Sequence, residues 1–403
     1  MGYLPLVYKV FQTAFLNSFE NAMKIVGQMV LIEILFKIFQ ETLITPMFKV
    51  LGKNDNTENN KNYYAKKFLW IYSLICAGFT LLLFLLLKPI MQISHIPEEI
   101  FDTTYTFLRM LVIANGIKII VQYLLTFNII SKATKKLFIY ILVSSAATLI
   151  LDVIFIPSWS LGFGVYGVGI VTLIINTIQL VYLILTMPKA QQVENYSFDF
   201  KKYTKLTLLS FFETVTRNLF YYFIILVFIN MLNNQGLYYV SNDYIWSIML
   251  IPTLAQNICI KQDISHDNSF SLKPYVLHNF LILGYMLLSV PVAFVLFKYV
   301  YKFENYFEYF ITLLKIAPCY IIFVFDNVIE SYFIATGKLK YVFIQTFITN
   351  ILVYLTSFIF YITGMWVITL DSIIIVFSAG IIVSSAYTLF AYIYDKKKNK
   401  VVT

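Results

Sequence analysis

The sequence predicts an all-α protein that crosses a membrane eleven or twelve times, and three observations predict this fold class. Of the 403 residues, 60% are hydrophobic and only 13% are charged, whereas a soluble domain is typically about 45–50% apolar and about 25% charged. The apolar residues occur in long blocks, as required for helices that span the hydrocarbon core. Residues 68–87 are apolar at nearly every position, so this block lacks the alternation of a membrane β-strand.

Each span is predicted from an apolar block that is long enough to cross a bilayer as a helix. The predicted spans are residues 24–50, 68–90, 104–130, 137–157, 165–187, 207–232, 238–260, 276–300, 309–334, 341–363 and 372–394. Segment 3–19 is also apolar, but it is short and interrupted by Lys9. We expect it to make less than a full span, as a truncated span, an interfacial helix or a stub that faces a partner. Asp243 lies near a span end, so we expect it at the membrane surface.

The loops predict the orientation of the chain, because lysines are retained on the cytoplasmic side of a membrane. Alternate loops are rich in lysine, from residues 53–67 and 132–136 to the tail at 396–400. The intervening loops hold only Lys88, Lys298 and Lys302. The C-terminus is therefore predicted to be cytoplasmic. The preference for lysine over arginine suggests an AT-rich bacterial genome, and we expect a multi-pass protein of a bacterial inner membrane.

The chain is predicted to consist of two six-helix lobes. Residues 133–137 (ATKKL) and 335–339 (ATGKL) are similar, and each joins an inward-running span to an outward-running one. Duplicated halves are a common plan of transporters, with the substrate site between them. The predicted parts are an N-terminal lobe at 1–187 whose first helix is short or missing, a cytoplasmic linker at 188–205, a C-terminal lobe at 206–395 and a basic tail at 396–403.

Several stretches resemble the multidrug and toxic compound extrusion (MATE) transporters, within the larger superfamily of multidrug, oligosaccharide-lipid and polysaccharide exporters. Residues 149–174 resemble the turn from the fifth to the sixth helix of that family, and 210–214 (SFFET) resemble the acidic stretch of its seventh helix. Residues 239–257 and 325–338 resemble its eighth and tenth helices. The resemblance covers almost the whole chain. It implies a secondary transporter that exports an organic solute or drug in antiport with Na⁺ or H⁺, by alternating access. It also implies an acidic coupling residue in the first helix, for which Glu20 is the nearest candidate.

Two carboxylates within one predicted span are the central candidates for ion coupling. Asp326 and Glu330 are four residues apart and therefore share a helix face. A charge at the centre of a bilayer costs about 2.5–3.5 kcal/mol on insertion scales. Neighbouring carboxylates in such a place are expected to bind a cation or to share a proton. The alternative is that Lys315, about three turns earlier on a similar face, or another residue of the same lobe neutralises one of them.

Glu213 and Arg217 form a second candidate pair at the same spacing. The resemblance places Glu213 at the acidic residue of the seventh helix, which implies that it takes part in coupling together with Asp326 and Glu330. The alternative is that the ion pair with Arg217 allows both residues to lie in a membrane helix.

Further charged residues inside the predicted spans are candidates for cavity or substrate contacts. Glu33, Lys37 and Glu41 form a ladder on one helix face, which favours a wet cavity wall or a lobe contact over a binding site. Arg109 and Lys118 are candidates to line a cavity for an anionic substrate.

The sequence lacks the signatures of several other functional classes. The three cysteines show no CxxC spacing and no HExxH motif occurs, which predicts no cofactor and no metal beyond a coupling Na⁺. The glycines at 162–169 lack the GK[ST] ending of a phosphate loop, so they indicate close helix packing. The lysines lie in short loops rather than in a basic soluble domain, which excludes nucleic acid as a partner.

We therefore expect a monomer without enzymatic activity, whose partners are the lipid bilayer and an organic small molecule. One alternative within the same superfamily is a flippase for lipid-linked oligosaccharide or polysaccharide precursors, which a strongly basic central cavity would favour. Alternatives from other classes are a coupling-defective membrane subunit and a polytopic membrane enzyme.

Overall fold

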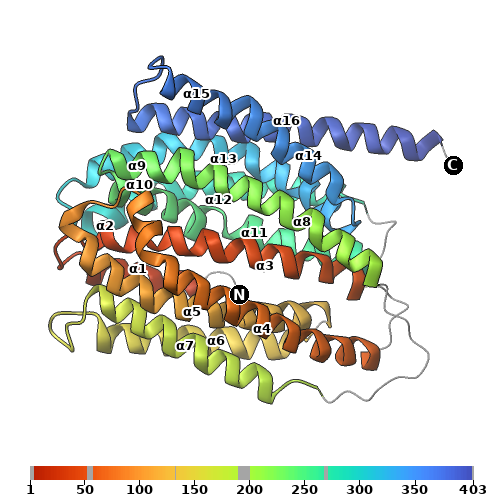
Figure 1. Ribbon diagram of the computed structural model, residues 1–403, viewed down its shortest axis with the longest axis horizontal. Coiled ribbons are helices and arrows are strands. Elements are labelled where there is room, and N and C mark those ends of the chain that lie inside the picture. Colours follow the sequence, from red (N-terminus) through yellow and green to blue (C-terminus); the bar gives the residue numbers. More distant parts are fainter. Residues whose placement is uncertain (1–3, 52–57, 132, 189–199, 267–270, 402–403) are drawn as a thin grey trace.

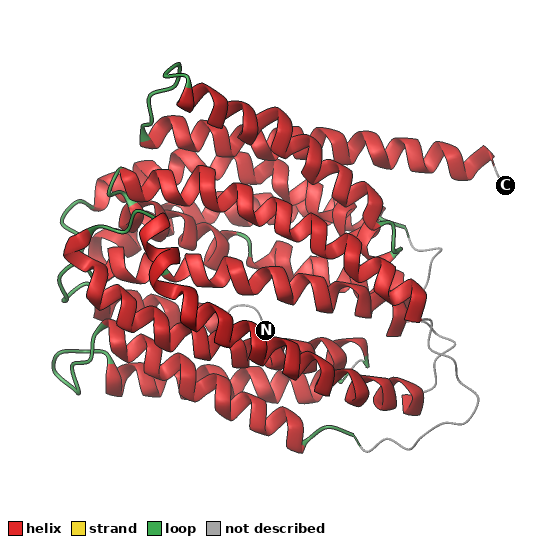
Figure 2. Cartoon of the chain, viewed as in Figure 1, coloured by secondary structure: helices red, strands yellow, loops and turns green. Residues whose placement is uncertain are grey.

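The computed structural model of the chain describes residues 4–51, 58–131, 133–188, 200–266 and 271–401, and these residues form helices and turns with no strand among them (Figure 2). The first half contains α1 (Leu4–Leu16), α2 (Ala22–Gly27), α3 (Met29–Leu51), α4 (Glu58–Ile93), η1 (Glu98–Ile100), α5 (Phe101–Ile130), α6 (Thr134–Phe155) and α7 (Val165–Leu185). The second half contains α8 (Phe200–Tyr221), η2 (Tyr222–Leu226), α9 (Val227–Met231), α10 (Gln235–Tyr244), η3 (Ile245–Met249), α11 (Ile251–His266), α12 (Lys273–Val295), η4 (Leu296–Val300), α13 (Tyr306–Ala335), α14 (Leu339–Thr349), η5 (Asn350–Leu355), α15 (Thr356–Ile362) and α16 (Leu370–Val401).

Most of these helices coincide with apolar stretches of the sequence. In the described part of the chain, nine helical stretches are long and apolar enough to cross a membrane. Two other long stretches, α3 and α10 to α11, are not among them. Both lie between the halves, because α3 packs against α8 and α10 packs against α2. A helix that faces protein on both sides can carry charges that a lipid-facing helix cannot, so the polar content of α3 and α10 follows from their position.

The two halves lie side by side, with α3 along the boundary between them (Figure 1). In the first half, α5 packs against α3, α4 and α7, and α6 packs against α1 and α7. In the second half, α13 packs against α11, α12 and α16, and α14 packs against α8 and α16. The same order of partners recurs in both halves, as a duplicated unit would produce. Because α8 begins at Phe200, residues 200–205 of the predicted linker are helical.

The N-terminal helix α1 has 13 residues, which corresponds to about 20 Å of helix against the ~30 Å hydrocarbon core. Its length agrees with the expectation that segment 3–19 makes less than a full span. The chain then turns through residues 17–21, where Asn21 has the left-handed φ of 54°. Asparagine tolerates this conformation better than most residues. Gln28 separates α2 from α3, so the predicted span at 24–50 is a broken helix.

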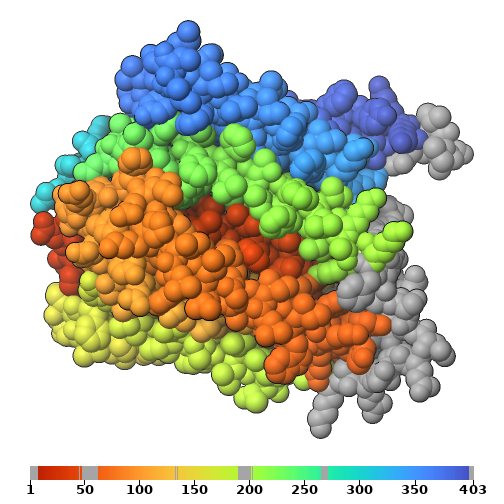
Figure 3. Space-filling view, viewed as in Figure 1, coloured from red at the N-terminus to blue at the C-terminus, as the bar shows by residue number. Residues whose placement is uncertain are grey.

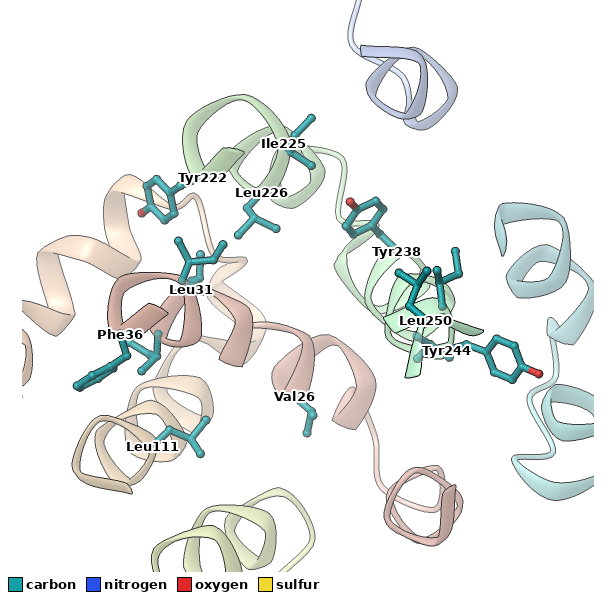
Figure 4. Close-up of a cluster of buried hydrophobic side chains, with 14 of the residues drawn as sticks. Val26, Leu31, Phe36, Leu111, Tyr222, Ile225, Leu226, Tyr238, Tyr244 and Leu250 are labelled. Atoms are coloured by element: carbon teal, nitrogen blue, oxygen red, sulfur yellow. The ribbon is translucent and has the colours of Figure 1, made fainter. Parts of the chain in front are cut away.

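Apolar side chains from both halves meet at the end of the bundle where α2 begins. Leu31 of α3 and Leu226 of η2 point toward one another, and Val26 of α2 and Tyr238 of α10 lie in the same cluster (Figure 4). These four side chains are at most 3% exposed. Close packing of these buried side chains stabilises the contact between the two halves, in addition to any polar interaction there.

Hydrogen bonds join the halves at both ends of the bundle. Near α2, Gln28 Nε2 donates to Asn230 Oδ1 at 3.0 Å. At the opposite end, Tyr203 OH donates to the carbonyl of Leu43 at 3.1 Å. The halves therefore contact each other at both ends of the bundle in this conformation.

Candidate functional site at the interface of the two halves

One face of α3 brings charged side chains to the boundary between the halves. Lys37 Nζ lies 3.8 Å from Glu41 Oε1 and 5.6 Å from the centre of the Trp246 ring on η3. Glu33 Oε1 lies 3.7 Å from Lys118 Nζ of α5, within the first half. In the space-filling view, α3 lies at the bottom of a hollow between α4 and α8 (Figure 3). Lys37 therefore lies toward the second half, as does Glu41, which pairs with Arg217 of α8. Glu33 instead pairs within the first half.

Arg217 of α8 holds carboxylates from both halves. Its Nε lies 2.9 Å from Glu213 Oε1, one helical turn earlier, and its Nη2 forms a close ion pair with Glu41 of α3. The Glu213 side chain is only 10% exposed. It accepts hydrogen bonds from Thr346 of α14 at 3.0 Å and from Thr214 at 3.1 Å. A guanidinium suits this arrangement because its donors lie in a fixed plane and can serve two carboxylates.

Glu330 of α13 and Lys261 of α11 extend this arrangement. Both interact electrostatically with Arg217, and Lys261 also interacts with Glu41 and with Glu330. We define the interface charge cluster as Lys37, Glu41, Glu213, Arg217, Lys261 and Glu330. It contains three carboxylates and three cations, contributed by four helices and by both halves, and its ion pairs within 4 Å join Lys37, Glu41, Glu213 and Arg217. Opposite charges in equal number reduce the cost of holding any of them within a membrane.

Asp326 lies one turn from Glu330 but faces a different neighbour. Its side chain is buried, and its polar neighbours are Ser385 and Thr388 of α16. Within the described part of the chain, its Oδ1 has no hydrogen-bond partner. The closest carboxylate to influence it is that of Glu330. A buried carboxylate oxygen without a donor is costly, and a proton, a cation or a rotation of the neighbouring Ser385 hydroxyl, which is also unpaired among the described residues, would satisfy it.

Lys315 does not neutralise this pair of carboxylates. Its Nζ lies 2.6 Å from Asp371 Oδ1 at the start of α16, and both side chains are exposed. Lys315 is therefore not the residue that neutralises the pair. Arg217 and Lys261 do interact electrostatically with Glu330, so the other form of the alternative, neutralisation by another residue of the lobe, stays open.

Other predicted residues lie apart from the interface charge cluster. The Arg109 guanidinium lies over the Phe84 ring of α4, 4.5 Å from its centre, on an exposed side of α5. Glu20 is exposed in the turn after α1. Asp243, which the sequence placed at the membrane surface, pairs with Lys9 at 2.8 Å. α10 begins eight residues earlier, so Asp243 lies about two turns inside the helix. Its place at the membrane surface stays a prediction.

The sequence did not mark two members of the cluster as site residues. Lys261 was assigned to a loop, because the apolar block ends at residue 260, whereas α11 continues to His266. Glu41 was considered only as part of a ladder, and its partner Arg217 is 176 positions away. The i, i+4 spacing of Lys37 and Glu41 was the only local signal.

The described residues contain no cluster of histidine, cysteine, aspartate and glutamate that could hold a metal ion. Binding of a monovalent cation or a proton to the Asp326 carboxylate does not require such a cluster. The roles assigned to Asp326, Glu330 and Glu213 remain predictions.

No known family profile and no curated protein matches the chain. Solved structures do match it over nearly its whole length. It is similar to a mutant MATE transporter of Vibrio cholerae, with 15% identity, a TM-score of 0.72, and coverage of 98% of this chain and 94% of the other. It is also similar to an outward-facing multidrug resistance MATE transporter, with 14% identity, a TM-score of 0.75, and coverage of 99% and 94%.

A third similar structure is a transporter of the same superfamily from Pyrococcus furiosus, with 13% identity, a TM-score of 0.74, and coverage of 98% and 93%. That protein is described as having a binding pocket of reversed polarity, which suggests a different function for it. At these identities the similarities show the fold. The chain has the fold of the MATE transporters, as the resemblance in its sequence implied.

Proposed function

We propose that this chain, with its MATE-type fold, is a secondary transporter that exports an organic solute in exchange for Na⁺ or H⁺ by alternating access. The interface charge cluster is the observation that carries the proposal. Charged side chains within a membrane are costly, and they commonly mark the path of a substrate or an ion. In this chain they join the two halves, where transporters built from duplicated halves place their substrate site.

The ion pair between Arg217 and Glu41 supports a mechanism in which the halves separate. The two residues belong to opposite halves, so opening the interface at this depth breaks the pair. Arg217 then keeps Glu213, which lies one turn away on its own helix. The cation is thus never left without a carboxylate, which keeps the cost of opening low.

Asp326 and Glu330 are the proposed coupling residues. Binding one proton or one Na⁺ changes the local charge by one unit. Since Glu330 interacts with Arg217 and Lys261, that change alters the balance of the cluster. A ligand shifts an equilibrium between two conformations only through a difference in its affinity for them. The interface charge cluster is intact when the halves are in contact and broken when they separate. An ion that binds beside it would therefore have different affinities for the two conformations.

The balance of charges does not favour the lipid-linked sugar flippase. That function calls for an excess of basic side chains to hold a polyanionic substrate. The interface charge cluster instead has as many carboxylates as cations.

The proposal is tested by solute flux in proteoliposomes. A panel of organic cations, neutral drugs and organic anions is offered to vesicles with an imposed Na⁺ gradient, a pH gradient or neither. We expect at least one solute to move against its own gradient only when an ion gradient is present. Protein-free liposomes and vesicles made leaky to ions are the controls. Flux that is equal with and without ion gradients would contradict secondary transport.

A further inference from the structure

Lys9 of α1 is held by two oxygens of α10. Its Nζ lies 2.8 Å from Asp243 Oδ1 and 2.8 Å from Ser247 Oγ. Ser247 Oγ in turn donates to Asp243 Oδ1 at 3.0 Å. The three atoms form a compact triangle in which a cation contacts one carboxylate and one hydroxyl oxygen. The contact joins the first half of the chain to the second, over a separation of 234 positions.

A small cavity adjoins this triangle. Its volume is about 20 Å³, and its walls include Lys9, Thr13, Tyr239, Asp243 and Ser247. A cavity needs roughly 10–15 Å³ to hold one water molecule, so one water fits beside the ammonium group. A carboxylate, a hydroxyl and a water are oxygen ligands, which hard metal cations prefer.

The local charges match a single positive charge. Asp243 provides one negative charge to the triangle. The next carboxylate in electrostatic range is Glu33 of α3, which already has Lys118 as a partner at 3.7 Å. One carboxylate and one ammonium leave the site neutral. A monovalent cation in place of the ammonium would do the same, whereas a divalent cation would leave an excess positive charge.

The protein does not fully enclose this triangle. The Lys9 and Asp243 side chains are 35% and 26% exposed, so neither is sealed in the core. Without the lysine, the space beside Asp243 would be open on the side that the protein does not cover. In the wild-type chain the ammonium occupies the place that a monovalent cation would take.

We propose that Asp243 and Ser247 form a monovalent cation site that the chain fills with its own lysine. Lys9 acts as a tethered cation, which keeps the contact between the halves neutral without an ion from solution. This site is separate from the proposed coupling pair Asp326 and Glu330 on α13, and it involves no transport step.

The test is equilibrium binding of radioactive Na⁺ to the purified full-length protein, with choline chloride to hold the ionic strength constant. The variants are Lys9→Met, which keeps the apolar stem but removes the charge, and Lys9→Met with Asp243→Asn. We expect Lys9→Met to bind one more Na⁺ per chain than the wild type, and the double variant to lose that additional ion. The matched control is Lys24→Met, which removes a lysine from the exposed pair with Glu99 and should leave the Na⁺ stoichiometry unchanged.

Equal Na⁺ stoichiometry in the wild type and Lys9→Met would overturn the proposal, and Lys9 would then be an ordinary ion-pair partner. If Lys9→Met is recovered only in Na⁺ buffer and not in choline buffer, the result supports the proposal, because the ion replaces the lysine. Failure of Lys9→Met and of Lys9→Gln to fold in either salt counts against it. The readout is independent of the proposed function, because a chain that transports nothing can still gain a Na⁺ site.

Discussion

At the scale of single residues, the unequal exposure of Arg217 and its partners decides which substitution is costly. The Arg217 side chain is 39% exposed, whereas that of Glu213 is 10% exposed. Removal of the guanidinium therefore leaves a nearly buried carboxylate with the Thr346 hydroxyl as a donor and the Thr214 hydroxyl, whose proton the carbonyl of Ser210 also accepts. Unpaired buried charges are the expensive outcome of breaking an ion pair.

We expect Arg217→Met to lower the stability of the protein by about 1–3 kcal/mol, less than the 3–5 kcal/mol of a fully buried pair because solvent screens part of the interaction. Adding Glu213→Gln should recover much of the loss, because no charge is then left unpaired. Thermal unfolding in detergent measures both effects. Arg109→Met is the control, since Arg109 lies over the Phe84 ring. If Arg109→Met and Arg217→Met lower the stability by the same amount, the interface charge cluster does not contribute more to stability than an exposed arginine does.

Asp326→Asn tests the coupling residue itself. An amide keeps the shape of the side chain and can donate to neighbouring oxygens, so we expect normal insertion and folding. It cannot take up a proton as a carboxylate does, and it removes the negative charge that would attract Na⁺. Gradient-dependent flux in proteoliposomes should be lost, while the yield and unfolding temperature remain close to those of the wild type. A variant that keeps gradient-dependent flux within about twofold, a factor equivalent to roughly 0.4 kcal/mol, would make Asp326 a structural residue.

At the scale of helices, close approach of backbones explains the glycines near residue 167. A Cβ atom added at Gly167 of α7 would lie 2.9 Å from the carbonyl oxygen of Phe155 at the end of α6. Since backbone cannot swing aside as a flexible side chain can, this position requires glycine. The sequence interpretation of these glycines as packing residues is thereby supported for Gly167, and small residues are common at contacts between membrane helices.

Gly167→Ala is expected to destabilise the chain by about 1–3 kcal/mol, the usual cost of overpacking. Gly78→Ala on α4 is the matched control, because a Cβ atom there would have nothing within 4 Å. The unfolding temperatures of the two variants in the same detergent provide the comparison. A similar unfolding temperature for both would show that α6 and α7 can move apart at little cost.

Hydropathy predicted the helices themselves but not their interruptions. The eleven predicted spans all coincide with helical stretches. Water is absent from the membrane, so each spanning segment must form its backbone hydrogen bonds internally, as a helix does. The break at Gln28 and the π-helical turn at 245–249, which carries Trp246, were not predicted. Such irregularities depend on tertiary packing rather than on local composition.

At the scale of the whole molecule, the sequence indicated which residues are charged but not which of them meet. The neighbours Glu213 and Arg217 were predicted to pair because one turn of helix separates them. Their connection to Glu41, and that of Lys9 to Asp243, could not be predicted. Those contacts join opposite halves, and no local periodicity encodes how two halves dock.

In the proposed mechanism, solute crosses the membrane when these halves separate, alternately at one end and the other. Gln28 and Asn230 join the halves at one end through a hydrogen bond of 3.0 Å. Cysteines at these two positions, in a chain whose native Cys76, Cys259 and Cys319 are replaced by serine, allow the halves to be linked with a short thiol-reactive crosslinker that can be cleaved by a reducing agent. The matched control replaces Lys24 and Glu99 by cysteine, because this pair lies within the first half.

Solute flux in proteoliposomes, measured before crosslinking, after it and after reduction, tests this claim most directly. We expect crosslinking between Gln28→Cys and Asn230→Cys to abolish gradient-driven flux and reduction to restore it. The control link between Lys24→Cys and Glu99→Cys should leave flux unchanged. Undiminished flux through a chain whose halves are shown to be fully crosslinked would contradict alternating access at this interface.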